Sequence, residues 1–328
     1  PTLRLGTRGS PLALAQAYEA KRRLAERYPE LAAEGAVEIQ VISTTGDERL
    51  EISLAEIGGK GLFTRELDLA LANQDVDFCV HSTKDVPTVL LPNTELVTML
   101  PREDTRDVLI TRDPSITRIE DLPSGSVIGT ASLRRQAQIY AKNPGLKCVN
   151  FRGNVQTRLK KLAAGDVDAT LLAYAGLKRM NMERHATRIL EWEEMLPAIA
   201  QGAISFQCRS DDEKTLKYLA PLNDLPTMQA VTCERAFLAT LDGNCKTPIA
   251  GQARVVDGQI HFEGLVASPD GQRVYMVERS GPVADAAAVG HAAGMEVREE
   301  AGEKFFEDMQ DYVQEMQAAN TKPTKNAD

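Results

Sequence analysis

A carboxylate and an ammonium group stand directly after an apolar stretch in the first third of the chain. Lys84 and Asp85 belong to the segment HSTKDVP at 81–87, which follows the β-like run Val76–Val80. Placing both charges at the end of a buried strand is costly unless they pair or have a use. The sequence therefore leaves two interpretations open: a structural Lys–Asp ion pair, or two charged groups in a functional cleft.

Arginines recur at the turns between predicted strands and helices. Arg8 stands between a strand-like segment and a helix start, Arg134 and Arg135 follow the segment GTAS at 129–132, and Arg152 follows another strand-like segment. In parallel α/β sheets such positions line the cleft at the carboxyl ends of the strands, where helix N-termini favour anions. Any one of these arginines could be an ordinary surface residue. Their repetition predicts that several elements converge on one anion site.

The glycine-rich segment GGKG at 58–61 does not have the phosphate-loop spacing G-x-x-x-x-G-K-[ST]. A nucleotide site is therefore weakly supported. The segment is either a mobile surface loop or a flexible element that brings Lys60 and Phe63 over an anionic ligand.

Cys245 lies in the turn-like segment LDGNCKTP at 241–248, whose composition should expose the thiol. The adjacent Lys246 favours the thiolate, whereas Cys79, inside an apolar run, is expected in the core. The 5 cysteines include no C-x-x-C pair, and the 4 histidines form no H-x-x-x-H pair. The sequence therefore predicts neither a disulfide framework nor a metal site.

The composition is that of an acidic globular protein. With 38 Lys and Arg against 47 Asp and Glu, the formal net charge is -9 and the pI about 5.2. This charge argues against nucleic acid and an anionic membrane, and on composition alone against any polyanionic partner. No run approaches the ~18 apolar residues of a membrane span, and residues 1–10 lack the apolar segment of a secretory signal. Together with the scattered cysteines, this predicts a cytoplasmic protein.

Strand-like and helical patterns alternate along most of the chain, which predicts an α/β architecture on largely parallel sheets. Ser10 and Asn154 are expected to be helix N-caps, and a polar segment at 101–105 suggests a domain boundary. Strands are expected at 2–6, 37–43, 76–80, 107–111, 126–129, 147–151 and 168–173, and helices at 11–28, 64–72, 133–142 and 155–164.

The last third of the chain has a different pattern, which combines a linker, strands and helices. The Asp257-Gly258 pair between two strand patterns predicts a hairpin turn. Residues 295–316 are expected to form one amphipathic helix that buries Phe305, Met309 and Tyr312. The linker is expected at 221–226, a further helix at 230–241 and strands at 252–256, 259–267 and 273–278.

Taken together, these segments resemble the porphobilinogen deaminase family, also called the hydroxymethylbilane synthases, over nearly the whole chain. No single segment is specific, but their order and spacing are. The segments are TRGSPLA at 7–13, GGKGLF at 58–63, HSTKDVP at 81–87, GTASLRR at 129–135, RGN at 152–154, TRL at 157–159, AGLKR at 175–179 and QGA at 201–203.

The resemblance implies a three-domain monomer with two α/β lobes, like those of periplasmic solute-binding proteins, and a smaller α+β third domain. Domain 1 would comprise residues 1–100 and 200–222, domain 2 residues 101–199, and domain 3 residues 223–328 with a disordered tail after about residue 320.

The resemblance further implies a transferase of tetrapyrrole and haem biosynthesis. The family joins four porphobilinogen molecules head to tail, releases ammonia at each step, and then releases the linear tetrapyrrole by hydrolysis. The primer would be a dipyrromethane cofactor, made from the substrate and joined by a thioether to Cys245. Asp85 would be the catalytic carboxylate, because loss of ammonia leaves a cation delocalised onto the pyrrole N–H, which a fixed carboxylate stabilises.

Each pyrrole also brings an acetate and a propionate, so the growing chain needs guanidinium and ammonium partners. The positions that match the family's cofactor-binding residues are Ser82, Lys84, Asp85, Thr130, Ser132, Arg134, Arg135, Arg152, Gly153 and Asn154. Those that match its substrate-binding residues are Arg8, Ser10, Lys60, Phe63, Arg158, Arg179 and Gln201.

The sequence departs from the family pattern at two places. Asn244 and Thr247 stand where the family often has a Gly before the cysteine and an apolar residue before the proline, and Ala200 stands where a Gly commonly precedes Gln201. Neither change removes a reacting atom. The main alternative is a two-lobed binding module for a carboxylate ligand; an exposed Cys245 without a secretory signal favours the enzyme.

Overall fold

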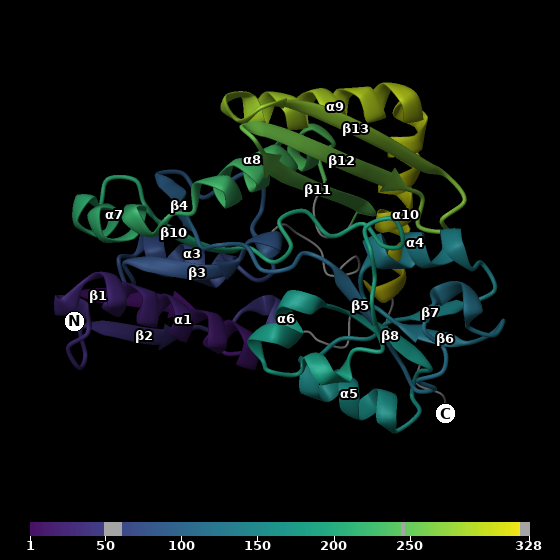
Figure 1. Cartoon of the computed structure of the whole chain (residues 1–328), viewed down its shortest axis with the longest axis horizontal. Coiled ribbons are helices and arrows are strands. Elements are labelled where there is room, and N and C mark those ends of the chain that lie inside the picture. The colour runs from purple at the N-terminus through teal and green to yellow at the C-terminus, as the bar shows by residue number, and fades with distance from the viewer. Residues whose placement is uncertain (49–60, 244–246, 322–328) are drawn as a thin grey trace.

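The computed structural model of the chain describes residues 1–48, 61–243 and 247–321. In this part of the chain, two five-stranded sheets and one three-stranded sheet organise the fold, each with its own helices (Figure 1). The predicted fold class, two α/β lobes with a smaller α+β unit, is confirmed. Of the helices in these ranges, none has the length and apolarity that crossing a bilayer requires.

The first sheet has the strand order β2-β1-β3-β10-β4. Helix α1 packs on one face through a core that includes Leu24 and Phe78, and α3 packs on the other through Leu67 and Cys79. The strands are β1 (Leu3–Thr7), β2 (Val37–Val41), β3 (Phe78–Ser82), β4 (Thr94–Met99) and β10 (Ile204–Arg209). The helices are α1 (Pro11–Arg27), α2 (Thr45–Glu48), α3 (Arg65–Ala72) and α7 (Glu213–Leu219).

The second sheet has the order β7-β6-β8-β5-β9. The chain enters it between β4 and β5 and leaves it between β9 and β10, and a hydrogen bond from Glu103 N to Gly202 O joins the two crossing segments. The strands are β5 (Asp107–Thr111), β6 (Val127–Gly129), β7 (Lys147–Val149), β8 (Ala169–Ala173) and β9 (Arg188–Ile189). The helices are α4 (Leu133–Lys142), α5 (Val155–Ala163) and α6 (Tyr174–Arg179).

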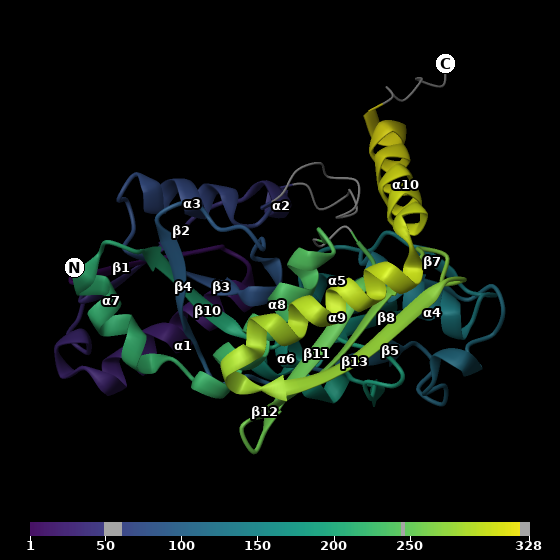
Figure 2. The same ribbon diagram turned by 90° about the horizontal axis from the view of Figure 1, so that it is seen from above.

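The third sheet is an antiparallel meander, against which two long helices pack (Figure 2). Its core includes the ring pair Phe237 and Phe262, whose centroids lie 4.8 Å apart. The strands are β11 (Ile249–Val256), β12 (Gln259–Ala267) and β13 (Val274–Pro282), and the helices are α8 (Leu225–Thr240), α9 (Ala286–Ala301) and α10 (Glu303–Thr321).

The prediction of largely parallel sheets was wrong in one respect. Strand β10 runs antiparallel to both β3 and β4, and β5 runs antiparallel to both β8 and β9, so each lobe has a mixed sheet. Because β4 and β10 had no clear pattern in the sequence, their places in the first sheet were not predicted.

Two other predictions need correction. The expected linker at 221–226 is largely helical, because Asp224 caps α8 and Pro226 occupies its first turn. The single helix expected at 295–316 is two helices, because Gly302 adopts φ 83° and ψ 154° and ends α9. Most of the tail expected to be disordered, residues 322–328, lies outside the described residues. The domain boundaries stay a prediction.

Candidate active site between the two lobes

Asp85 lies in a short turn that hydrogen bonds hold in place at both ends. Strand β3 passes into a 3-10 turn over Thr83–Asp85, and Thr83 N donates to Ala203 O at 3.0 Å. Beyond the turn, Arg235 of α8 donates to the carbonyl oxygens of Val86 and Pro87 at 2.9 and 2.7 Å. The Asp85 side chain remains 23% exposed, so its carboxylate is positioned by the backbone and still accessible.

Arg8 reaches Asp85 from the neighbouring strand. It follows β1, two residues before Ser10, which caps α1 by accepting a hydrogen bond from Ala13 N at 3.3 Å. Arg8 Nη1 lies 3.7 Å from Asp85 Oδ2. Among the described residues, Asp85 thus pairs with Arg8 rather than with the adjacent Lys84, which removes the structural Lys–Asp pair as an explanation.

Phe63 marks the meeting point of the two lobes. The guanidinium carbon of Arg8 lies 4.2 Å from the centre of the Phe63 ring, and that of Arg152, from the second lobe, lies 5.9 Å from the same centre. Cations over an aromatic face are attracted by its quadrupole. The ring therefore contacts one predicted anion-binding arginine from each lobe.

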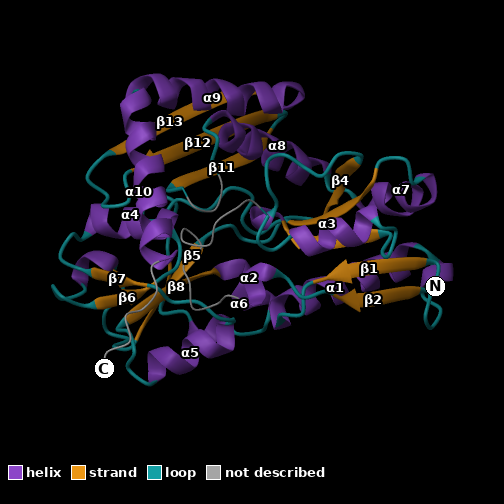
Figure 3. Ribbon diagram, turned by 180° about the vertical axis from the view of Figure 1, so that it is seen from behind, coloured by secondary structure: helices purple, strands orange, loops and turns teal. Residues whose placement is uncertain are grey.

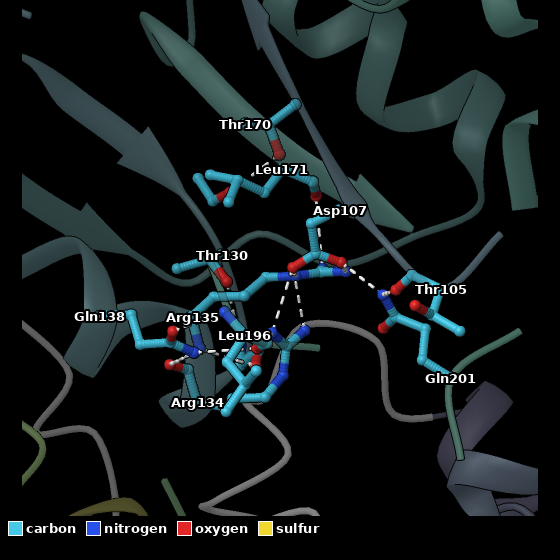
Figure 4. A network of polar contacts seen from close by, with 12 residues as sticks. Thr105, Asp107, Thr130, Arg134, Arg135, Gln138, Thr170, Leu171, Leu196 and Gln201 are labelled. Atoms are coloured by element: carbon cyan, nitrogen blue, oxygen red, sulfur yellow. Dashed lines mark hydrogen bonds and ion pairs between the residues drawn. The ribbon is translucent and has the colours of Figure 1, made fainter. Parts of the chain in front are cut away.

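The second lobe contributes Arg134 and Arg135 from the first turn of α4, which Ser132 caps. Both side chains are buried and share one carboxylate, that of Asp107 at the start of β5 (Figure 4). Arg134 Nη1 and Nη2 lie 3.1 Å from Asp107 Oδ2, and Arg135 donates to both carboxylate oxygens at 3.0 and 3.1 Å. Burial alone would raise the pKa of Asp107, but the two guanidinium groups outweigh it and keep the pKa low.

Gln201 completes this network from the segment that returns to the first lobe. Its side-chain amide donates to Asp107 Oδ1 at 2.7 Å and to Thr105 O at 2.8 Å. The side chain is fully buried, and its Oε1 has no hydrogen-bond partner among the described residues. Gln201, predicted to bind substrate, therefore joins the two crossing segments at the start of β5.

Positive charge gathers around this junction. Burial and the nearby guanidinium groups of Arg135 and Arg152 lower the pKa of Arg158 to about 10. Lys84 is exposed to solvent, but many protein atoms surround its side chain. The resulting desolvation, and then the Arg135 guanidinium, lower the pKa of Lys84 to about 8. Desolvation is the main cause of both shifts, and the neighbouring guanidinium groups add to it, so several cations lie close together at this junction. This cluster of cations fits a ligand that carries several carboxylates.

Several predicted hydrogen-bonding residues have local partners in the structure. Asn154 caps α5 by accepting from Thr157 N at 2.8 Å, and Ser82 Oγ donates to Gln16 at 3.1 Å. Thr130 Oγ1 accepts from Ser132 N at 3.1 Å. Gly153, the residue before Asn154, adopts φ 128°, and its carbonyl oxygen accepts from Arg158 Nε at 3.1 Å. Arg179 donates to Gly202 O at 2.9 Å.

Two of the predicted site residues, Lys60 and Cys245, lie outside the described residues.

Two carboxylates in this region were not singled out from the sequence. Asp107 begins an apolar strand, where a charge requires a partner, and this could have pointed to it. Asp47 pairs with Arg8 and lies in α2, within the polar segment TTGD at 44–47 that follows β2 at the same end of the sheet as Arg8. Neither signal says which arginine is the partner.

Comparisons with known proteins identify the family of the chain. Residues 3–217 match the family model described as "Porphobilinogen deaminase, dipyromethane cofactor binding domain", and residues 228–299 match "Porphobilinogen deaminase, C-terminal domain". The chain belongs to the porphobilinogen deaminase family. The resemblance inferred from the sequence is confirmed, and the binding-module alternative is set aside.

Curated porphobilinogen deaminases are similar over nearly the whole chain. The chloroplastic enzyme of Oryza sativa subsp. japonica is 57% identical over 94% of this chain and 86% of its own. The porphobilinogen deaminase of Nitrobacter hamburgensis is 52% identical over 92% of this chain and 94% of its own.

Among solved structures, the periplasmic aliphatic sulphonate binding protein of Escherichia coli is 14% identical, with a TM-score of 0.39, over 73% of this chain and 70% of its own. At that score the match adds nothing to the topology described above.

Proposed function

We propose that the junction between the two lobes is the catalytic site at which this porphobilinogen deaminase extends its pyrrole chain, with Asp85 as the catalytic carboxylate. The observation that carries this proposal is the position of Asp85, accessible yet fixed in a turn anchored to Ala203 and Arg235. A carboxylate held in place needs no reorganisation when positive charge develops beside it.

Asp85 acts when the carbon–nitrogen bond of porphobilinogen breaks and ammonia leaves. The ring that remains is an electron-poor azafulvene whose positive charge is shared with the pyrrole N–H. The Asp85 carboxylate stabilises this charge and accepts a hydrogen bond from the N–H. Later in the cycle it is placed to take up the proton that the newly joined ring loses when the carbon–carbon bond has formed.

The surrounding cations bind the carboxylates of the pyrroles. Lys84, Arg135 and Arg158 stand near one another, and guanidinium groups match carboxylates in a bidentate geometry. Arg8, Arg134 and Arg152 extend the cationic surroundings on both sides of Phe63 and Asp107. Hydrogen-bonding neighbours would be the remaining predicted residues, Ser10, Ser82, Thr130, Ser132, Gly153, Asn154, Arg179 and Gln201.

The dipyrromethane cofactor of the family fits this donor set, because its carboxylates would balance the clustered cations. When bound, it supplies the electron-rich pyrrole to which the first substrate molecule is joined. Cys245 is its proposed attachment point, with Lys60 as a further cation near the substrate.

The decisive experiment on the catalytic role is the variant Asp85→Asn, which keeps the shape of the side chain and removes its charge. We expect turnover of porphobilinogen to fall by roughly 100-fold or more while the fold is retained. Asp166→Asn, an exposed change in the second lobe, is the control and should leave turnover unchanged. Near-normal consumption of porphobilinogen by Asp85→Asn would refute the role.

The attachment of the cofactor is tested by intact-protein mass spectrometry. The purified chain should be heavier than its sequence by one dipyrromethane, and the extra mass should disappear in Cys245→Ser but remain in Cys148→Ser. An unmodified chain that still turned over porphobilinogen would contradict the proposed attachment.

We also propose that the protein acts as a monomer in the cytoplasm, which size-exclusion chromatography with light scattering and cell fractionation would test. The net charge of -9 still argues against nucleic acid and anionic membranes as partners.

A further inference from the structure

Arg8 is shared unequally between two carboxylates. Its Nε donates to Asp47 Oδ2 at 2.9 Å, and its Nη2 forms a second, short contact with Asp47 Oδ1. Asp85 is left with Nη1, at a distance of 3.7 Å that is too long for a hydrogen bond. One edge of a planar guanidinium can bind one carboxylate through two hydrogen bonds. In Arg8 this edge consists of Nε and Nη2, and Asp47 occupies it.

Asp47 is itself held in place. Thr44 Oγ1 donates to Asp47 Oδ2 at 2.6 Å, and the Asp47 backbone N–H donates back to Thr44 Oγ1 at 3.3 Å. Thr45, which follows Thr44 in the chain, donates hydrogen bonds from its N–H and its hydroxyl to Glu66 of α3 at 3.2 and 2.7 Å. Helix α2, which carries Asp47, lies at the end of the first lobe that faces the second (Figure 3).

Phe63 restricts Arg8 from another side. The ring lies 4.2 Å from the guanidinium carbon, so the group is confined between the ring and the Asp47 carboxylate. The two carboxylates and the guanidinium together carry one net negative charge. Burial would raise the pKa of Asp47, but the hydrogen bond and charge of Arg8, the Thr44 hydrogen bond and the Arg152 charge together outweigh burial and lower the pKa, so Asp47 is ionised at neutral pH.

We propose that Asp47 is a positioning residue that binds Arg8 through Nε and Nη2 and thereby keeps the Arg8–Asp85 ion pair long, without a hydrogen bond to the Asp85 carboxylate. This inference rests on the catalytic role proposed for Asp85. If the charge of Asp47 were removed, Arg8 would be free to turn this edge to Asp85, and the pair would carry no net charge. A carboxylate neutralised in this way stabilises a developing cation less well.

The test compares Asp47→Asn with the unchanged holoenzyme in steady-state assays with porphobilinogen. We expect kcat to fall by about 10- to 100-fold, the factor that corresponds to one charge-assisted hydrogen bond gained by Asp85 in the ground state. KM should change by less than about threefold, because no group that binds substrate is removed. Asp47→Glu keeps the charge and should recover most of kcat.

The structure offers a matched control at the other end of β1. Arg4 donates to Asp77 at 3.3 and 3.0 Å through Nε and Nη2, which is the same bidentate arrangement remote from Asp85. Asp77→Asn therefore removes an equivalent ion pair and should leave kcat unchanged. Thermal unfolding of both variants separates a loss of folded protein from a loss of turnover.

A second measurement shows whether Asp47 acts through Arg8. In the background Arg8→Gln, the further change Asp47→Asn should not lower kcat again, because the guanidinium edge that Asp47 occupies is gone. An additional loss in that background would overturn the proposal. So would an unchanged kcat in Asp47→Asn, or a lower KM alone, which would mean that Asp47 competes with substrate for Arg8. If Asp85→Asn itself remains active, the proposed function fails; if it is inactive while Asp47→Asn is normal, only this inference fails.

Discussion

Lys84 has a charge that should change at mildly alkaline pH. Desolvation by the surrounding protein, and then the Arg135 guanidinium, lower its pKa to about 8. Because this pKa is lowered, the ammonium is present below about pH 8 and is lost as the pH rises through that value. We therefore expect kcat/KM for porphobilinogen to fall above about pH 8, because a neutral Lys84 binds the carboxylates of the substrate less tightly.

The variant Lys84→Arg tests this assignment, because a guanidinium stays charged throughout the accessible range. Its kcat/KM profile should extend to higher pH than that of the unchanged enzyme. Lys214→Arg, an exposed change on α7, should leave the profile as it is. An alkaline limb at the same pH in Lys84→Arg would show that another group titrates.

For individual residues, the sequence predicts which residue types stand at the strand ends but not which of these residues form pairs. Arg8 and Asp85 were both expected at one site, and in the structure Arg8 Nη1 lies 3.7 Å from Asp85 Oδ2. The pairing of Arg134 and Arg135 with Asp107, 27 and 28 residues away, and of Gln201 with Asp107, 94 residues away, was not expected. Such pairs depend on how distant segments come together, which a local pattern does not contain.

Secondary-structure elements are predicted well where periodicity and end signals agree. Helix α4 and strands β5 and β12 have the expected bounds, and Ser10 and Asn154 cap their helices as expected. The prediction fails at the end of α9, because apolar spacing continues across Gly302 while the backbone does not. One residue at positive φ overrides a periodic pattern on both sides of it.

A substitution at Gly302 tests why the helix is interrupted between α9 and α10. With φ 83° and ψ 154°, it occupies a region that essentially only glycine adopts. A Cβ at this position would meet no atom within 4 Å, so any cost of Gly302→Ala arises from the backbone alone. We expect the free energy of unfolding to fall by about 1–3 kcal/mol, measured by urea unfolding.

A surface change on the preceding helix is the control for this variant. Ala288→Ser, at an exposed position of α9, should change the free energy of unfolding by no more than about 0.5 kcal/mol. Turnover of porphobilinogen should be normal in both variants, since Gly302 belongs to the helices of the third sheet and a Cβ there would meet no other residue within 4 Å. A fully stable Gly302→Ala would mean that α9 and α10 can be joined without strain.

For the whole molecule, the average charge was a poor guide to the ligand. The prediction that an acidic protein has no polyanionic partner was wrong for this family, whose substrate and cofactor carry several carboxylates. The net charge of -9 is a sum over the chain, whereas Lys84, Arg135 and Arg158 gather at one junction. Binding depends on the local field rather than on the sum.

The arrangement of the three sheets is likewise decided by contacts that no local pattern indicates. Glu234 of α8 is fully buried, and Arg102, in the segment leading into the second lobe, donates to its two oxygens at 2.6 and 2.9 Å. The same carboxylate accepts from Ala200 N at 2.7 Å, in the returning segment, and from Ala253 N of β11 at 2.9 Å. One side chain therefore joins the third sheet to both crossing segments.

Replacing Glu234 should loosen this junction more than a surface change would. Glu234→Gln leaves Arg102 without its buried counter-ion, and we expect the free energy of unfolding to fall by about 3–5 kcal/mol. Glu296→Gln, which removes an exposed pair with Arg279, should cost less than about 1 kcal/mol.

The single tryptophan reports on the same junction. Trp192 donates to Thr105 Oγ1 at 3.1 Å and packs against a cluster that includes Leu265 of β12. Urea unfolding followed by Trp192 fluorescence and by far-ultraviolet circular dichroism should give coincident curves for the unchanged protein. In Glu234→Gln the fluorescence transition should come at lower urea than the loss of secondary structure, because the third sheet separates first. Coincident curves in this variant would show that the sheets stay docked without Glu234.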